Sequence, residues 1–570
     1  MEERTHDWFP AQRLCPAGVA GRPAPFRLSV PMVEDPGMTS PSRLFEMLEG
    51  APDGAPAIVT PGRTVTFGEL RRDSARLAAS FKRLGLTRGD RLALWLTNVP
   101  EWLVVAMACS RLGVAVVSLN VRFGSHEVGS LLARTGCRAV VLSPAHRKGL
   151  CVEVLQAVAP EQRAALTLVV TCGSSVPVLD SVAQTALEDL ITDDGPEIAD
   201  GQPGDVCLIL STSGTTSAPK LVMHTQERNC RHAGDAAGAI ALPEPGTSLL
   251  LGIPMCGAFG YTLALAALRA QRPIILMESF VPEEAARLLV EHGVTHMLGT
   301  DDMLDKILAV VPEGKPFPAL RMFGHANFTP ALTGVLPGRA EAHGVLLRGF
   351  FGMTETLAMF AAQPADAPLE RRAQGGGLPT CRDAAIRVRD PESGELLADG
   401  EVGAVELRAP NAMIGYLNDE AATTAAFTGD GWLQTGDLGY RLPDGGFVFI
   451  ARMKDVLRIG GYLVSPTEIE DAILSTPGIV TCQVVAASCA AGTRPVAFVV
   501  MQPGAALDEA AVLAACRTQL AVYKVPVRVF ALDAMPVTDG PNGAKVKKNV
   551  LREMADERLN AADAVPAAQG

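Results

Sequence analysis

A run of small hydroxyl residues follows a predicted buried strand in the first half of the chain. The strand is "DVCLIL" and the run is "STSGTTSAPK", residues 211–220. Backbone N–H groups, hydroxyls and a lysine at the end of a strand together form a concave set of donors for phosphate. The spacing differs from that of the Walker loop, in which Gly-Lys is followed directly by serine or threonine. From these residues alone, a phosphate site and an ordinary surface loop are both open.

Four further motifs carry residue types that suit nucleotide chemistry. They are "FGMTE" at 351–355, "GWLQTGDLG" at 431–439, "ARMKDVLRIGGYLVSPTEIE" at 451–470 and "MPVTDGPNGAKVKK" at 535–548. With the hydroxyl-rich loop, they resemble in order and spacing the signature of the acyl-adenylate-forming superfamily. That superfamily contains acyl-CoA synthetases, luciferases and the adenylation domains of peptide synthetases. The resemblance covers residues 40 to about 555, and five motifs in register make coincidence a poor explanation.

In that superfamily a carboxylate attacks ATP to give an acyl-adenylate and pyrophosphate, and the acyl group then passes to a thiol. The first step joins two anions, so it needs charge neutralisation and alignment. The resemblance implies that Thr354 hydrogen-bonds the α-phosphate and that Glu355 holds Mg²⁺, a hard cation that prefers carboxylate and phosphate oxygens. It also implies that the outer phosphates of ATP contact the loop at Thr212, Ser213, Gly214, Thr215, Thr216 and Lys220.

The nucleoside half of ATP is assigned by the same resemblance. Asp437 would accept the ribose hydroxyls, and Arg452 would support the same sugar. Phe350 or Phe351 would stack on adenine. We assign no chemistry to the histidine of the opposite wall, because a lone histidine is more often structural. The remaining residues expected around the nucleotide are Gly324, His325, Ala326 and Gly352.

The last motif is expected to supply the catalytic lysine. Ala544 separates Gly543 from Lys545, whereas the superfamily has Gly-Lys directly. Lys545 is followed three residues later by Lys548, as the superfamily spacing requires, so we choose Lys545 over Lys547. The resemblance further implies a hinge at Lys454.

A pair of glycines after that hinge is expected to contact the acceptor. Gly460 and Gly461 would let the pantetheine arm of coenzyme A pass close to the backbone, which glycine allows best. We see no carrier domain and no phosphopantetheine serine, so free coenzyme A is the simplest acceptor.

The segment "IPMCGAFGYTLAL" is expected to line the acyl pocket. Members that activate amino acids place an aspartate there, and none occurs between Ile253 and Leu265. Because an unpaired ammonium would be costly in such a pocket, amino acids are poor candidates. We expect an apolar acid, fatty or ring-bearing, and leave the two open. The expected pocket residues are Gln226, Phe259, Gly260, Met353, Leu357 and Met359.

Three positions in the phosphate-loop region depart from the superfamily pattern. Ser217 and Leu221 stand where glycine is usual, so a loop that needs positive φ there would be strained. Gln226 replaces a common histidine beside the carboxylate pocket, and an amide can hydrogen-bond but carries no charge.

The elements that must position these residues follow a β-α-β rhythm. Apolar strands alternate with amphipathic helices from about residue 41 to 450, which predicts parallel sheets covered by helices. Short strands with glycine turns between 382 and 450 add a small β-barrel-like part to this large α/β domain, residues 41–452. A mobile α+β lid domain is expected at 453–557, a flexible leader at 1–40 and a disordered tail at 558–570.

Composition restricts the class of protein. A chain of 570 residues with 48% hydrophobic residues suggests about 4 folding units. The net charge of −12 disfavours nucleic acid and anionic membrane as partners. The cysteines show no CxxC pair, and no signal peptide or membrane span is evident, so we expect a reduced, cytoplasmic protein. A homodimer is left open.

The sequence therefore predicts an AMP-forming acid–CoA ligase that uses ATP, Mg²⁺ and coenzyme A. One alternative is an acyl-AMP ligase that loads a separate carrier protein. Another is a catalytically silent nucleotide-binding relative, which the lost glycines suggest. The joint presence of Glu355, Asp437, Arg452 and Lys545 argues against a silent protein.

Overall fold

The computed structural model describes residues 40–145, 150–174, 176–180, 182–192, 195–212, 219–326, 332–459, 462–489, 492–540 and 543–563. The chain divides into two compact units, of which the second runs from Thr39 to Gly570 and contains all the described residues. The predicted leader, 1–40, therefore lies almost wholly outside the described residues.

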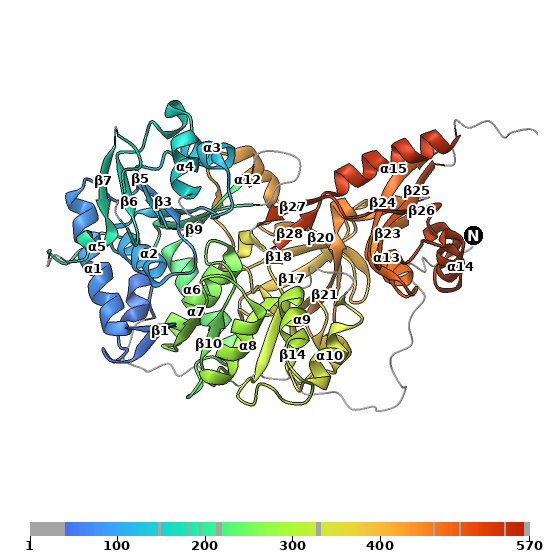
Figure 1. Cartoon of the computed structure of the whole chain (residues 1–570), viewed down its shortest axis with the longest axis horizontal. Coiled ribbons are helices and arrows are strands. Elements are labelled where there is room, and N and C mark those ends of the chain that lie inside the picture. Colours follow the sequence, from blue (N-terminus) through green and yellow to red (C-terminus); the bar gives the residue numbers. More distant parts are fainter. Residues whose placement is uncertain are drawn as a thin grey trace, which may run out of the picture. The chain divides into compact units, whose positions relative to one another are not determined.

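An eight-stranded sheet forms the first layer of the large domain (Figure 1). Its strands are parallel from β8 to β7, whereas β9 and β19 run antiparallel at the other edge. Their near-continuous apolar runs suit parallel strands that are covered on both faces. The order is β19 (Gly415–Tyr416), β9 (Leu221–Thr225), β8 (Val206–Ser211), β4 (Ala115–Ser118), β3 (Arg91–Trp95), β5 (Ala139–Leu142), β6 (Leu168–Thr171) and β7 (Ala183–Ala186).

A thirteen-stranded sheet combines a parallel and an antiparallel part. Strands β1, β11, β10, β12, β13 and β14 are parallel, and the strands from β15 to β17 in the sheet order are paired antiparallel. Of these, β17, β18, β20 and β21 correspond to the short strands expected between 382 and 450. The order is β17 (Ala385–Arg389), β18 (Val402–Arg408), β20 (Leu433–Arg441), β21 (Phe447–Arg452), β16 (Gly376–Pro379), β15 (Ala361–Ala362), β14 (Leu347–Phe351), β13 (Met322–Ala326), β12 (His296–Thr300), β10 (Leu249–Leu251), β11 (Ile274–Leu276), β1 (Pro56–Thr60) and β2 (Arg63–Thr66).

Helices cover these sheets, and their ends follow local sequence signals. The helix α1 begins with a capping box between Thr66 and Glu69, and α2 begins with Pro100 and ends at the left-handed Gly113. The helices of the large domain are α1 (Phe67–Arg83), α2 (Pro100–Leu112), α3 (Ser125–Thr135), α4 (Leu150–Ala157), α5 (Leu187–Leu190), α6 (Gln226–Ala239), α7 (Ala258–Arg269), α8 (Pro282–Glu291), α9 (Asp301–Ala309), α10 (Leu336–Ala342), α11 (Leu369–Arg372) and α12 (Glu420–Ala426).

One large hydrophobic core joins α1, α2, α6 and α7 to one face of each sheet. Helices α6 and α7 lie side by side in the middle of the large domain (Figure 1). The apolar run at 102–119 is buried and forms most of α2 and β4. Its helix belongs to this core, whereas its strand contributes to this core and to a second cluster on the other face of the sheet. In the described ranges, no helix is both long and apolar enough to cross a bilayer.

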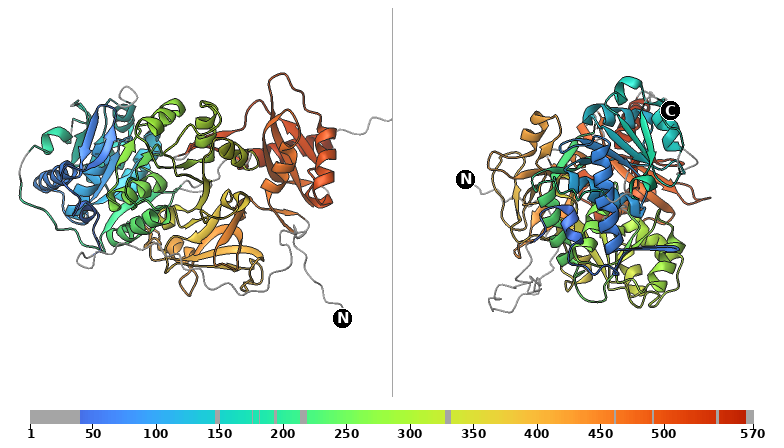
Figure 2. Two further views of the ribbon diagram at one scale, coloured as in Figure 1. Left: turned by 90° about the horizontal axis from the view of Figure 1, so that it is seen from below. Right: turned by 90° about the vertical axis from the view of Figure 1, so that its left-hand side faces the viewer.

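A small α+β domain follows the large one (Figure 2). Its central sheet sends alternate residues to opposite faces. Val484 packs with α13 and α14, whereas Val485 packs with α15. The elements are β22 (Leu457–Ile459), β23 (Tyr462–Val464), α13 (Pro466–Leu474), β24 (Ile479–Cys489), β25 (Gly492–Met501), α14 (Glu509–Gln519), β26 (Arg528–Ala531), β27 (Val537–Gly540), β28 (Gly543–Val546) and α15 (Lys548–Asp563).

The predicted fold class is confirmed, but the predicted tail begins too early. Helix α15 continues to Asp563, so residues 558–563 are helical and the disordered tail at 558–570 is wrong for those residues. The physical reason is the apolar spacing of Leu551, Ala555 and Leu559, which places all three in one buried cluster on the central sheet.

Candidate active site

The motif "FGMTE" forms a tight loop at the end of β14. A side chain at Gly352 would place its Cβ 2.5 Å from the Cα of Ala358, so only glycine fits where the loop folds back on itself. Thr354–Thr356 form a 3₁₀ turn, and the next three residues all adopt left-handed backbone conformations, with φ of 59° at Leu357, 57° at Ala358 and 42° at Met359.

A chain of contacts links Glu355 to the end of the hydroxyl-rich loop. The Tyr416 hydroxyl donates a 2.9 Å hydrogen bond to Oε1 of Glu355. The Lys220 ammonium lies 4.5 Å from the centre of the Tyr416 ring, a cation–π contact. Burial and the charge of Glu355 raise the pKa of Tyr416, so the phenol stays protonated and remains a donor. The contact between Tyr416 and Glu355 was not predicted from the sequence. The only local signal was a tyrosine next to a glycine, which does not indicate a partner.

Asp437 is a buried carboxylate in the same site. Its side chain is fully buried in β20, and Nε of Arg452 lies 3.0 Å from Oδ1. Within the described residues, however, neither carboxylate oxygen accepts an aligned hydrogen bond. Burial raises the pKa of Asp437 to about 7, because it outweighs the opposing effect of Arg452 and the charge of Glu355 acts in the same direction. The structure thus brings Asp437, Arg452 and Glu355 together.

The backbone oxygen of Thr354 is hydrogen-bonded to the side chain of His224. His224 is a buried residue of strand β9, and its Nε2 lies 2.8 Å from the backbone oxygen of Thr354. Because a carbonyl can only accept, this nitrogen carries the proton. Burial lowers the pKa of His224 to about 3, so the ring is neutral. The Met413 N–H donates a 2.7 Å hydrogen bond to the backbone oxygen of Glu355. The backbone oxygens of Thr354 and Glu355 are therefore both hydrogen-bonded.

Gln226 occupies a different environment from the one expected. Its side chain is fully buried, and Oε1 accepts hydrogen bonds from the Leu44 N–H at 3.2 Å and from the Ser110 hydroxyl. Its Nε2 donates to the backbone oxygens of Ser110 and Gln202, each at 3.2 Å. This amide therefore joins the start of the domain to α2, and these bonds leave it no free group for the carboxylate of a substrate.

The two ends of the hydroxyl-rich loop, Thr212 and Lys220, are hydrogen-bonded to each other. Ser213, Gly214, Thr215, Thr216 and Ser217 lie outside the described residues. The Thr212 N–H donates to the Lys220 oxygen at 2.9 Å, and the Lys220 N–H donates to the Thr212 hydroxyl at 3.2 Å. Leu221, the second departure from glycine, begins β9 as a buried residue without positive φ. It therefore introduces no backbone strain.

The two candidate phenylalanines lie in different clusters. The ring of Phe351 contacts Phe447 and Phe449, with centroid distances of 5.0 and 5.7 Å. Phe350 belongs to the large core, where a Cβ on Gly324 would come within 2.7 Å of its ring. The absence of a side chain at Gly324 therefore makes room for Phe350, while the choice of the adenine partner stays a prediction. His325 is buried and Ala326 half-buried at the end of β13.

Three of the expected acyl-pocket residues belong to the large hydrophobic core. Phe259 on α7, Leu357 and Met359 are all buried in the large core. The Thr262 hydroxyl, also on α7, donates to the Leu357 oxygen, which ties the helix to the left-handed turn. Gly260 packs against Pro254, whose oxygen would lie 2.3 Å from any Cβ there. Met353 packs instead beside Tyr416.

The C-terminal candidates are only partly described. Lys454 lies in a 3₁₀ turn (Met453–Asp455) between β21 and β22, where its backbone oxygen accepts a 3.4 Å hydrogen bond from Arg552. Short 3₁₀ turns of this kind are common connectors between elements, and the hinge at Lys454 stays a prediction. Lys545 belongs to β28, paired with Thr538 of β27, but its side chain lies outside the described residues. Gly460 and Gly461 also lie outside them.

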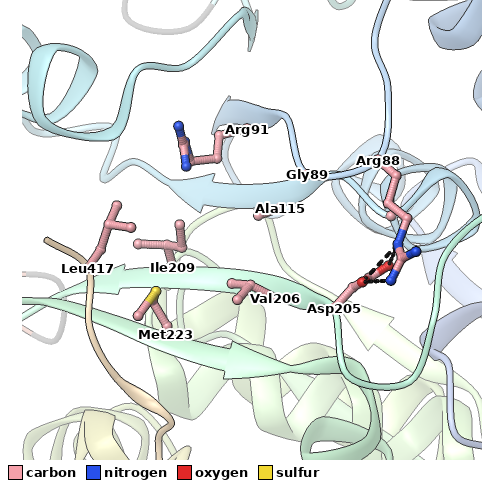
Figure 3. A pocket seen from close by; sticks show the side chains of 10 residues that line it. Arg88, Gly89, Arg91, Ala115, Asp205, Val206, Ile209, Met223 and Leu417 are labelled. Atoms are coloured by element: carbon pink, nitrogen blue, oxygen red, sulfur yellow. Dashed lines mark hydrogen bonds and ion pairs between the residues drawn. The ribbon is translucent and has the colours of Figure 1, made fainter.

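A cavity of about 420 Å³ is lined by none of the expected site residues (Figure 3). It is at the amino-terminal ends of β3, β4 and β8, whereas the hydroxyl-rich loop follows the carboxyl end of β8. Arg88 and Asp205 form an ion pair on one side, and the rest of the lining is mostly apolar. The cavity and the candidate active site are therefore distinct.

The chain matches two protein-family models. Residues 44–417 match the AMP-binding enzyme family, and residues 468–540 match the AMP-binding enzyme C-terminal domain. The first match covers more than half of the chain, so this protein belongs to the AMP-binding enzyme family.

Named relatives resemble the chain over almost its whole length. It is 32% identical over 547 residues to the 3-(7a-methyl-1,5-dioxo-octahydro-1H-inden-4-yl)propanoyl:CoA ligase of Mycobacterium tuberculosis, covering 90% of this chain and 99% of that protein. It is 30% identical over 480 residues to 2-succinylbenzoate–CoA ligase of Geobacillus kaustophilus, covering 83% and 90%. The solved structure of ATP-bound MatB from Rhodopseudomonas palustris matches with a TM-score of 0.78 at 27% identity, covering 91% of this chain and 99% of that chain.

Proposed function

We propose that this chain is an ATP-dependent acid–CoA ligase that produces AMP. An oxygen of the substrate carboxylate attacks the α-phosphorus of ATP, and pyrophosphate leaves. The thiol of coenzyme A, on losing its proton, then attacks the acyl carbon, and the bond between that carbon and the bridging oxygen breaks to release AMP. The acyl-adenylate formed in the first step is the substrate of the second step.

The observation that carries this proposal is the buried carboxylate of Asp437. A buried carboxylate without aligned hydrogen bonds is costly unless a ligand supplies donors. The two adjacent hydroxyls of a ribose offer two donors at the right spacing for the two oxygens. Arg452, beside Asp437, would keep the carboxylate ionised when the sugar is bound.

Lys220, Thr354 and Glu355 would handle the phosphates. Glu355 has one described side-chain hydrogen bond, from Tyr416 to Oε1, so Oε2 is left to bind a cation. Mg²⁺ would be held there together with phosphate oxygens, and it would supply charge neutralisation. Tyr416 fixes the carboxylate that faces the cation, while Lys220 adds positive charge where the loop ends.

The acid is proposed to be apolar and ring-bearing. Phe259, Leu357 and Met359 are apolar and buried in the large core, and none of them could pair with a substrate ammonium. The names of two relatives, which include 2-succinylbenzoate and an indenyl propanoate, favour a ring over a plain fatty chain. Coenzyme A is the acceptor that all the CoA ligase names share.

The small domain is proposed to act as a lid that turns about Lys454 between the two steps. Lys545 would be near the α-phosphate during adenylation, and Gly460 and Gly461 would be near the thiol during transfer. A change in a few backbone angles at an element boundary is enough for such a rotation.

The test is pyrophosphate release by purified protein with a panel of aryl, cyclic and fatty acids, with and without coenzyme A. We expect release that depends on the acid, and a thioester when coenzyme A is present. Release of pyrophosphate without any thioester from free coenzyme A would favour the carrier-protein alternative. Absence of release with every acid would contradict adenylation.

A further inference from the structure

The left-handed turn Leu357–Met359 is conformationally expensive. Left-handed backbone is rare for residues that carry a Cβ, and here it occurs in three successive non-glycine residues. Such a conformation persists only where the surroundings impose it. The turn also contains two expected acyl-pocket residues, Leu357 and Met359.

Two buried side chains impose the conformation through backbone oxygens. Nε2 of His232 on α6 lies 3.2 Å from the Leu357 oxygen and 3.0 Å from the Ala358 oxygen. The Asn411 amide lies 3.0 Å from Nδ1 of His232 and donates a 2.7 Å hydrogen bond to the Thr356 oxygen. Both side chains are almost completely buried.

These contacts determine the protonation of the ring. Two carbonyl oxygens at Nε2 require a proton on that nitrogen, and the Asn411 N–H requires a lone pair on Nδ1. Burial lowers the pKa of His232 to about 4, which agrees with this single neutral form. The ring therefore acts as a fixed donor at Nε2 and acceptor at Nδ1, and it stays neutral near pH 7.

His224 and His232 are hydrogen-bonded to different parts of the same loop. His224 binds the oxygen of Thr354, in the part of the loop assigned to the nucleotide, whereas His232 binds Leu357 and Ala358, in the part assigned to the acid. We propose that His232, together with Asn411, is a positioning residue that holds the turn Leu357–Met359 and thereby sets acid specificity. This inference rests on the proposed function, because it assumes that the turn borders the acyl pocket.

The experiment compares His232→Gln with the matched control His224→Gln. For each variant, KM is measured for ATP and for a preferred and a poor acid, and folding is checked by thermal unfolding. For His232→Gln we expect KM for the preferred acid to rise about tenfold and discrimination between acids to fall, with KM for ATP changed less than about threefold. His224→Gln should instead act mainly on ATP.

A rescue distinguishes positioning from general structural support. Glycine adopts the left-handed conformation at no steric cost, so Ala358→Gly should hold the turn without its histidine. The double variant His232→Gln, Ala358→Gly should recover most of the lost discrimination. If His232→Gln does not fold, Asn411→Ala provides the same comparison, because it removes the donor to Nδ1 and leaves the ring in place.

Unchanged acid discrimination in the folded His232→Gln protein, equal effects on ATP and acid, or no recovery in the double variant would each overturn the inference. These results leave the proposed function intact, since the wild-type protein would still release pyrophosphate with acid. A wild-type protein that is inactive with every acid would instead remove the proposed function and, with it, this inference.

Discussion

The charge on Glu355 is the feature that a single substitution isolates best. Glu355→Gln keeps the shape of the side chain, and Tyr416 can still donate to the amide oxygen. Because the cation loses a charged ligand, we expect pyrophosphate release to fall by about 10²–10³. Near wild-type release would contradict the role of Glu355.

Tyr416→Phe provides a graded control for that variant. It removes one hydrogen bond to the carboxylate and leaves both the charge and the aromatic ring below Lys220. We expect about a tenfold loss of pyrophosphate release, smaller than that of Glu355→Gln. A larger loss than in Glu355→Gln would mean that the ring, rather than the carboxylate, dominates the site.

The raised pKa of Asp437 predicts that the stability of the protein depends on pH. Its pKa is raised from 3.8 to about 7, so its contribution to stability is full below pH 3.8 and is lost as the pH rises through about 7, where the buried charge must form. Asp437→Asn should therefore raise the melting temperature at pH 8 by roughly a few degrees, and by less at pH 5. ATP affinity of this variant should fall at both pH values. An equal change in melting temperature at both pH values would contradict the raised pKa.

At the scale of elements, the β-α-β rhythm predicted the parallel sheets and the covering helices of the large domain. The short strands expected between 382 and 450 correspond to β17, β18, β20 and β21. These predictions succeeded because hydrophobic periodicity is a local property of the sequence.

The support of the candidate site was harder to predict, because it depends on distant contacts. His224 and His232 reach carbonyls more than 120 positions away in the chain, and Tyr416 reaches Glu355 across 61 positions. Nothing in their local sequence marks those partners. The apolar spacing that extends α15 was, by contrast, visible in the sequence, but the small domain was predicted to end at residue 557, whereas the helix continues to Asp563.

The extended end of α15 gives a stability prediction. Leu559 is buried against the central sheet of the small domain, so Leu559→Ala should cost about 2 kcal/mol of that domain's unfolding free energy. Glu557→Ala, at an exposed position of the same helix, should change it by less than about 0.5 kcal/mol. Chemical denaturation compares the two variants, and equal effects would show that Leu559 does not anchor the helix.

At the scale of the whole molecule, the lid proposal divides the reaction between two groups of residues. Lys545→Ala should lose activation of the acid by ATP, yet still convert supplied acyl-adenylate and coenzyme A into thioester. Gly461→Leu should form acyl-adenylate but transfer it poorly, because a side chain would narrow the path of the thiol. Each half-reaction is assayed separately, and equal loss of both halves in Lys545→Ala would refute the division. Activity lost in Lys547→Ala but not in Lys545→Ala would show that the lysine register is wrong.

The path of one oxygen atom tests the central claim, which is that the acid is activated as an acyl-adenylate before transfer to coenzyme A. A preferred acid labelled with oxygen-18 in both carboxylate oxygens is converted to thioester. The masses of AMP, pyrophosphate and phosphate are then measured by mass spectrometry. Attack of the carboxylate on the α-phosphorus and later cleavage of the acyl–oxygen bond should leave one labelled oxygen in AMP for each thioester formed. Unlabelled AMP, or label in pyrophosphate or phosphate, would contradict the account.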